Sequence, residues 1–180
     1  IIKETEVQVD KLDVKIDKLC QRIFALSQPV ATDLRFIMSS LRIGSEMERI
    51  ADIAYDISMH AESLGKIQRQ QKNYKINDLL KEIEKLLNQT QEAYLNLNSS
   101  LADDIISDSR KLNETCSKVF KNIVADMSEK SEVIYYATDL ILIINNLDRM
   151  ISHIRNITES IVFIAEGKII KHGTRKNKQG

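Results

Sequence analysis

Residues 29–60 read PVATDLRFIMSSLRIGSEMERIADIAYDISMH, and this stretch decides the fold. It begins at the only proline of the chain, and apolar residues then recur at steps of three and four as far as Gly44. That period places them on one face of an α-helix. Beyond Gly44 the stripe carries carboxylates instead, because Glu48 and Asp52 are four residues apart on the same face and Asp56 extends the row.

Like charges on the core-facing side of a helix are unfavourable unless a positive charge neutralises them. Two interpretations of the acidic row are open from spacing alone. In the first, the carboxylates bind a cation. In the second, the row lies at the edge of the stripe, where it is solvated or paired with Arg35, Arg42 or Arg49.

The same helical period continues through most of the chain. With one proline, five glycines, no tryptophan, 43% hydrophobic and 29% charged residues, the composition is that of a globular all-α protein. No apolar run is long enough to span a membrane, and because residues 1–17 carry many charges we expect no signal peptide there. We expect no strand and five helices, near residues 1–27, 29–64, 76–97, 102–127 and 132–167.

An internal repeat is visible when the chain is aligned with itself, with Cys20 opposite Cys116 and Glu48 opposite Asp148. The predicted fold is therefore a tandem pseudo-repeat of three-helix bundles with spectrin-like, up-down-up topology, lying side by side with separate cores. The expected domains are residues 1–67 and 75–170, followed by a basic tail at 171–180 that we expect to be solvated. Because the first copy shows only two helices, its first helix is expected upstream of residue 1.

A second pair of carboxylates, Asp13 and Asp17, has the same four-residue spacing in the first predicted helix. If the first two helices are antiparallel neighbours, these side chains face Glu48 and Asp52, and four carboxylates then offer oxygen ligands for one or two metal ions. In the second copy only Asp148 remains acidic. The other three aligned positions hold Ser109, Asn113 and Ser152. His153 could add a nitrogen ligand, although a lone histidine is more often structural.

The stretches QPVATDLR (28–35) and SLRIGSEMERIADIAYDI (40–57) resemble the signature of the PhoU family of phosphate-signalling proteins. The resemblance implies tandem three-helix bundles and metal clusters at acidic E(D)xxxD motifs. It assigns the ligands to Asp13, Asp17, Glu48 and Asp52, with Asp148 as a weak fifth. Iron, nickel or zinc is the implied transition metal, and a site without metal is the alternative.

The same resemblance implies a function. It indicates a cytoplasmic accessory protein that acts as a negative regulator of phosphate transport and phosphate-starvation signalling. Its implied partners are a phosphate ABC transporter and a phosphate-sensing histidine kinase, through which it would reach the membrane, and it could form a homodimer. The alternative is a cytosolic PhoU-like domain of a sodium–phosphate cotransporter.

Other classes of function are disfavoured by the residues themselves. A di-metal carboxylate enzyme pairs each glutamate with a histidine three residues on, but Glu48 is followed there by Ala51. There is no glycine-rich phosphate loop and no serine elbow, so we expect no enzyme activity. Acidic and basic residues balance at 26 each, so the chain has no net positive charge that would attract it to nucleic acid. Cys20 and Cys116 lie among apolar residues and are expected to be equivalent, buried, reduced thiols rather than a disulfide.

Overall fold

A computed structural model describes residues 2–66 and 73–169, and within them the secondary structure consists of helices joined by short turns, with no strand. The all-α prediction is confirmed, while the predicted basic tail at 171–180 lies outside the described residues. The elements are α1 (Ile2–Ser27), α2 (Ala31–Gly65), α3 (Ile76–Asn96), α4 (Ser99–Glu129), a 3-10 turn η1 (Ser131–Val133) and α5 (Ile134–Glu166).

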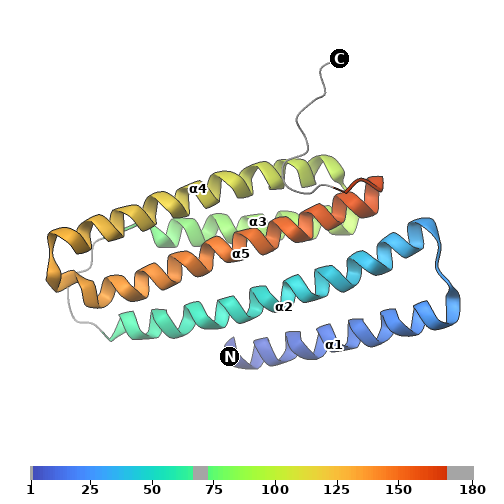
Figure 1. Cartoon of the computed structure of the whole chain (residues 1–180), viewed down its shortest axis with the longest axis horizontal. Helices are drawn as coiled ribbons and strands as arrows, with labels where there is room; N and C mark the ends of the chain where they lie inside the picture. Colours follow the sequence, from blue (N-terminus) through green and yellow to red (C-terminus); the bar gives the residue numbers. More distant parts are fainter. Residues whose placement is uncertain (1, 67–72, 170–180) are drawn as a thin grey trace, which may run out of the picture.

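Four of the helices lie side by side in one layer, in the order α1, α2, α5, α4, and α3 lies behind α4 and α5 (Figure 1). Neighbours in the layer are antiparallel. The most extensive contact joins α2 to α5, whereas α1 contacts only α2 among the described elements. Each copy of the repeat, called a unit below, therefore contains a helical hairpin. The hairpin is α1–α2 in the first unit and α4–α5 in the second, which also contains α3.

Local signals explain where the helices begin and end. Gly167 terminates α5 with a positive φ of 69°, and its amide donates to the Phe163 carbonyl. The side chain of Asn98 accepts a hydrogen bond from the Leu101 amide and caps α4. This cap starts α4 at Ser99, three residues before the predicted start at residue 102.

The expectation of two separate cores is wrong. The buried side chains form one cluster that takes residues from α2, α3, α4 and α5, so the two units share a core across the α2–α5 contact. The central helix α5 has sixteen buried residues, and α1 has one, Cys20. Among the described elements α1 packs on α2 alone, so its attachment depends on this single interface, in which only Cys20 of α1 is buried. The predicted division at residues 67–75 stays a prediction.

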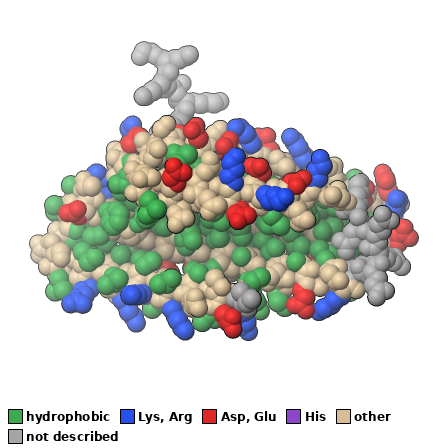
Figure 2. Space-filling model, turned by 180° about the vertical axis from the view of Figure 1, so that it is seen from behind, with side chains coloured by type: hydrophobic (Ala, Val, Ile, Leu, Met, Phe, Trp, Pro, Cys, Tyr) green, Lys and Arg blue, Asp and Glu red, His purple; other side chains and the backbone are tan. Residues whose placement is uncertain are grey.

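The two hairpins differ in what covers them. Tyr136 and Leu147 of α5 are 7% and 0% exposed, whereas Phe36 and Met47, at the aligned positions of α2, are 44% and 41% exposed. The difference arises because α3 packs against α4 and α5, and no described helix covers the same side of α1 and α2. Hydrophobic side chains accordingly form a band on the face seen from behind (Figure 2).

Gly44 allows α1 and α2 to approach each other closely. A Cβ at this position would lie 2.8 Å from Oδ1 of Asp13 and 3.5 Å from Cδ1 of Ile16. We expect Gly44→Leu to push α1 away from α2 and to speed amide exchange throughout α1. Gly65→Leu is the matched control, because nothing lies within 4 Å of a Cβ there. Equal exchange in the two variants would show that the close contact at Gly44 is absent in solution.

Candidate functional site

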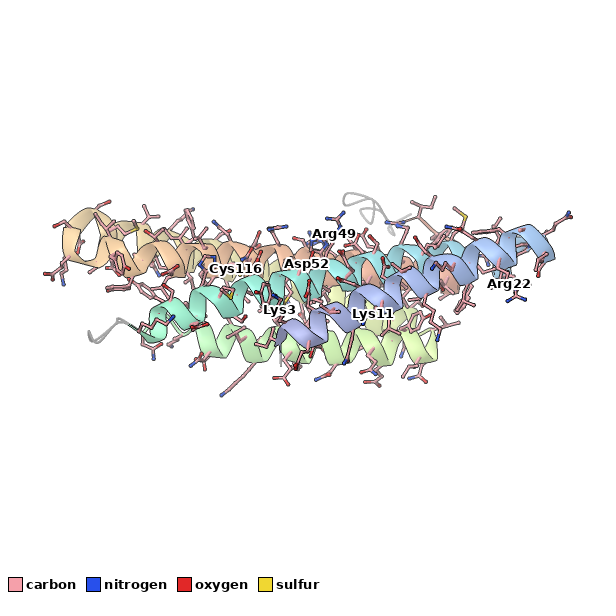
Figure 3. The ribbon with its side chains drawn as sticks, turned by 90° about the horizontal axis from the view of Figure 1, so that it is seen from below. Lys3, Lys11, Arg22, Arg49, Asp52 and Cys116 are labelled. Atoms are coloured by element: carbon pink, nitrogen blue, oxygen red, sulfur yellow. The ribbon has the colours of Figure 1, made fainter. Side chains whose placement is uncertain are left out.

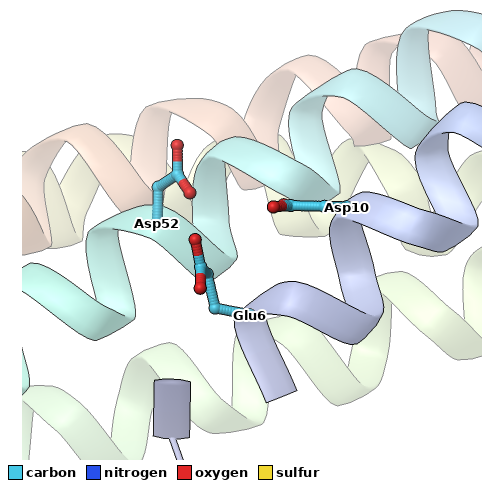
Figure 4. Close-up of side chains that lie close together, drawn as sticks. All are labelled: Glu6, Asp10 and Asp52. Carbon is cyan, nitrogen blue, oxygen red and sulfur yellow. The ribbon is translucent and has the colours of Figure 1, made fainter. Parts of the chain in front are cut away.

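Three carboxylates converge where α1 lies against the middle of α2. Glu6 and Asp10 come from α1 and Asp52 from α2, and one ligand atom from each lies within 4.8 Å of the others (Figure 4). Glu6 and Asp10 are half-buried and Asp52 is exposed, so the cluster lies at the edge of the hairpin with one side open to water.

Two further acidic residues, Glu48 and Asp13, border this cluster, and neighbouring carboxylates raise the pKa values of both. The pKa of Glu48 is raised by burial and then by the charge of Asp52, with smaller effects of Asp10 and Asp13, while Arg49 offsets part of the rise. The pKa of Asp13 is raised by burial and by the charges of Asp17 and Asp10. The α1–α2 contact therefore concentrates negative charge in a partly dehydrated region.

The described basic side chains do not pair with the cluster. In the described part of the chain, neither a lysine nor an arginine forms an ion pair with Glu6, Asp10 or Asp52. Figure 3 labels Asp52 together with three basic residues of the same hairpin, Lys3, Lys11 and Arg49. The pairing of the acidic row with arginines, which the spacing left open, is not formed by the described side chains. Oδ1 of Asp10 is buried and has no hydrogen-bond partner.

The set of residues differs from the predicted one because the pairing of the two helices is displaced. Cys20 contacts the Ile37 carbonyl and Asp13 lies against Gly44. In an antiparallel pair with this alignment, Asp10 lies beside Glu48 and Glu6 beside Asp52. The structure thus brings Asp52 into the cluster and places Glu48 and Asp13 at its border.

Asp17 lies about two helical turns from the cluster along α1. The expectation that Asp13 and Asp17 face Glu48 and Asp52 is therefore wrong by one heptad. Sequence reasoning missed Glu6 and Asp10 as partners, although they have the same Glu-x-x-x-Asp spacing as Glu48 and Asp52. Metal binding by any of these residues stays a prediction.

At the corresponding place in the second unit, hydrogen bonds join the side chains of α4 and α5 directly. Nδ2 of Asn113 donates to Oδ1 of Asp148 at 2.6 Å and to the Asp148 carbonyl at 3.1 Å. This pair corresponds to Asp10 and Glu48, and Ser109 and Ser152 stand at the places of Glu6 and Asp52. The predicted weak ligand Asp148 is thus already bonded to an amide.

His153 also has a hydrogen-bond partner, since its Nδ1 lies 2.5 Å from Oε2 of Glu46 on α2. A second histidine, His60, pairs with Asp139 at 2.9 Å near the other end of the α2–α5 contact. Both histidines therefore join α2 to α5. Neither belongs to the acidic group between α1 and α2.

Both cysteines are free and buried, as predicted. Burial and the charge of Asp148 raise the pKa of Cys116 to about 12, and burial and Asp17 raise the pKa of Cys20, so both are neutral thiols near pH 7. Their predicted equivalence is wrong, because Cys20 lies beside Ile37 whereas Cys116 lies near Asp148. The alignment of α1 with α4 is therefore displaced by one heptad from the alignment that matches the two cysteines.

The raised pKa of Glu48 leads to a prediction about pH. A carboxyl group with a raised folded-state pKa contributes stability that is present below its ordinary value of 4.5 and is lost as the pH rises through the folded pKa. Without metal, we expect Glu48→Gln to be more stable than the parent at pH 7 and to lose this advantage as the pH falls toward 4. Urea unfolding at both values measures the difference. A constant difference would show that the charge of Glu48 is not repelled.

A tandem of helical hairpins with an acidic cluster on the first hairpin defines an all-α repeat protein with a candidate cation site. In the described residues no helix is both long and apolar enough to cross a membrane. The PhoU domain model matches residues 1–61 and 76–161, which is most of the chain, and the chain belongs to the PhoU family.

Relatives and solved structures agree with this assignment. A phosphate-specific transport system accessory protein PhoU homolog of Pseudomonas aeruginosa is 24% identical over 172 residues, which cover 95% of this chain and 71% of that protein. A homolog of the same description from Archaeoglobus fulgidus is 28% identical, with 93% and 76% covered. The crystal structure of PhoU from Pseudomonas aeruginosa matches with a TM-score of 0.89 at 24% identity, covering 93% of this chain and 80% of that one. This structure supports the fold.

Proposed function

We propose that the protein is an accessory regulator of a phosphate-specific transport system that works through contacts with other proteins rather than by catalysis. The match of the PhoU domain to both hairpins is the observation that carries this proposal. The curated relatives are named as accessory proteins of such a system. A phosphate ABC transporter and a phosphate-sensing histidine kinase are the proposed partners, and the cytoplasmic location and negative regulation expected from the resemblance belong to the same proposal.

A metal site between α1 and α2 is the second part of the proposal. Glu6, Asp10 and Asp52 would hold the ion, with Glu48 at the border as a further oxygen donor. The residues fit a cation for two reasons: the buried Oδ1 of Asp10 has no hydrogen-bond partner, and none of the arginines and lysines within residues 2–66 and 73–169 forms an ion pair with the cluster. All donors are carboxylate oxygens, which suit hard cations such as manganese better than they suit nickel or zinc.

The ion would act on the attachment of α1. A bound cation would turn the repulsion among these carboxylates into attraction. This matters for α1 because it packs on no described helix other than α2 and has one buried residue, Cys20. The proposed role of the metal is therefore to fix the first hairpin in the form that partners recognise.

Deleting the gene tests the regulatory part of the proposal. In medium rich in phosphate, we expect the deletion strain to express a phosphate-starvation reporter that the parent strain keeps repressed. Returning the intact gene should restore repression, and returning the Asp10→Asn, Asp52→Asn variant should restore it only in part. An unchanged reporter in the deletion strain would contradict regulation of phosphate signalling.

A further inference from the structure

The second hairpin contains an arginine at the place where the first hairpin has none. Nη1 of Arg155 donates to Oδ1 of Asn113 at 2.9 Å, and Nη2 lies 3.5 Å from Oγ of Ser152. Asn113 in turn donates through Nδ2 to Asp148 at 2.6 Å. The amide of Asn113 thus connects a guanidinium to a carboxylate, and only this orientation of its oxygen and nitrogen satisfies both neighbours.

The charges of the two hairpins differ in a matched way. The first hairpin has Glu6, Asp10, Glu48 and Asp52 at the four aligned positions, and Tyr55 stands where the second has its arginine. The second hairpin keeps one carboxylate, Asp148, and balances it with one cation through one amide. At this one position an arginine is therefore present in the hairpin whose acidic set has been reduced, and a tyrosine stands in the hairpin whose acidic set is complete.

Burial makes this arrangement effective. Asn113, Asp148 and Arg155 are all half-buried, so their charge-assisted hydrogen bonds are screened less than those of an exposed ion pair. The network joins α4 to α5 at the level where the acidic cluster joins α1 to α2. In this network the positive charge comes from the guanidinium of Arg155 and not from a bound metal ion.

We infer that Arg155 is a built-in cation of the second hairpin, which holds α4 on α5 without metal and restricts the metal response of the protein to the first hairpin. Asn113 is the positioning residue that transmits the charge to Asp148. The contrast with the first hairpin rests on the proposed metal site. The role of Arg155 itself does not.

A double-mutant cycle without metal gives the main test. Arg155→Gln should lower the melting temperature by about 3–6 °C and speed amide exchange in α4 around Asn113. Arg149→Gln is the matched control on the same helix. Asn113→Asp should lower the melting temperature more in the Arg155→Gln background than in the parent, because two carboxylates then face each other without a cation. Additive effects, or equal effects of the two arginine variants, would overturn the inference.

A reciprocal substitution tests whether an arginine can do the same in the first hairpin. Tyr55→Arg should raise the melting temperature in the absence of metal and reduce the shift produced by Mn²⁺, whereas Tyr55→Gln should do neither. If Tyr55→Arg lowers stability as much as Tyr55→Gln, a guanidinium at this position does not balance the cluster and the inference fails. If the parent shows no Mn²⁺ shift, the proposed metal site fails, and the metal-free cycle still decides the role of Arg155.

Discussion

Replacing Leu147 by alanine is expected to lower the free energy of unfolding by about 2–5 kcal/mol, which is among the largest effects available in this chain. Leu147 lies on α5, is 0% exposed and belongs to the core that α2, α3, α4 and α5 share. Its removal would leave a cavity that the surrounding helices cannot fill. Thermal or urea unfolding followed by circular dichroism measures the loss.

Met47→Ala is the matched control, because Met47 occupies the aligned position in α2 but is 41% exposed. We expect this substitution to cost less than about 1 kcal/mol. Equal losses in the two variants would mean that the open side of the α1–α2 hairpin is covered in solution. The pair of variants therefore measures how differently the two hairpins are buried.

The helices themselves could be predicted from the sequence because a 3.6-residue apolar period is strong and local. Gly167 marks the end of α5 by backbone chemistry alone, close to the predicted end at residue 167. Pro29 lies in the turn, two residues before α2 begins at Ala31, so the predicted start at residue 29 is slightly early. The start of α4 was placed too late because Asn98 acts through its side chain, and residue type does not distinguish a cap from a turn. The shared core was not predictable, since periodicity does not tell which apolar faces meet.

The acidic site shows a different limit. Moving seven residues along a helix returns nearly to the same face, so Asp13 and Asp17 fit the pattern as well as Glu6 and Asp10 do. Only contacts between the helices separate the two pairs, above all Asp13 against Gly44 and Cys20 against Ile37. The same seven-residue ambiguity made the two cysteines look equivalent. The first unit's acidic character was thus readable, but the pairing of its helices was not.

Metal binding should have the second large effect. A cation that binds the folded first hairpin at 100 times its dissociation constant stabilises it by about 2.7 kcal/mol, which corresponds to a rise of about 5–10 °C in melting temperature. The rise should be accompanied by slower amide exchange in α1 and the middle of α2. The α4–α5 hairpin should respond little, because Asp148 is already bonded to Asn113.

Calorimetric titration of Mn²⁺ into three proteins tests the acidic site most directly. The first is the parent, the second carries Asp10→Asn with Asp52→Asn, and the third carries Asp17→Asn with Asp56→Asn. Both variants lose two carboxylates from the same two helices, so general charge effects are matched. We expect the parent and the Asp17, Asp56 variant to bind Mn²⁺ with similar affinity and the Asp10, Asp52 variant to lose binding at least tenfold. Loss of binding in the Asp17, Asp56 variant with retention in the Asp10, Asp52 variant, or no binding by the parent, would contradict a metal site at Glu6, Asp10 and Asp52.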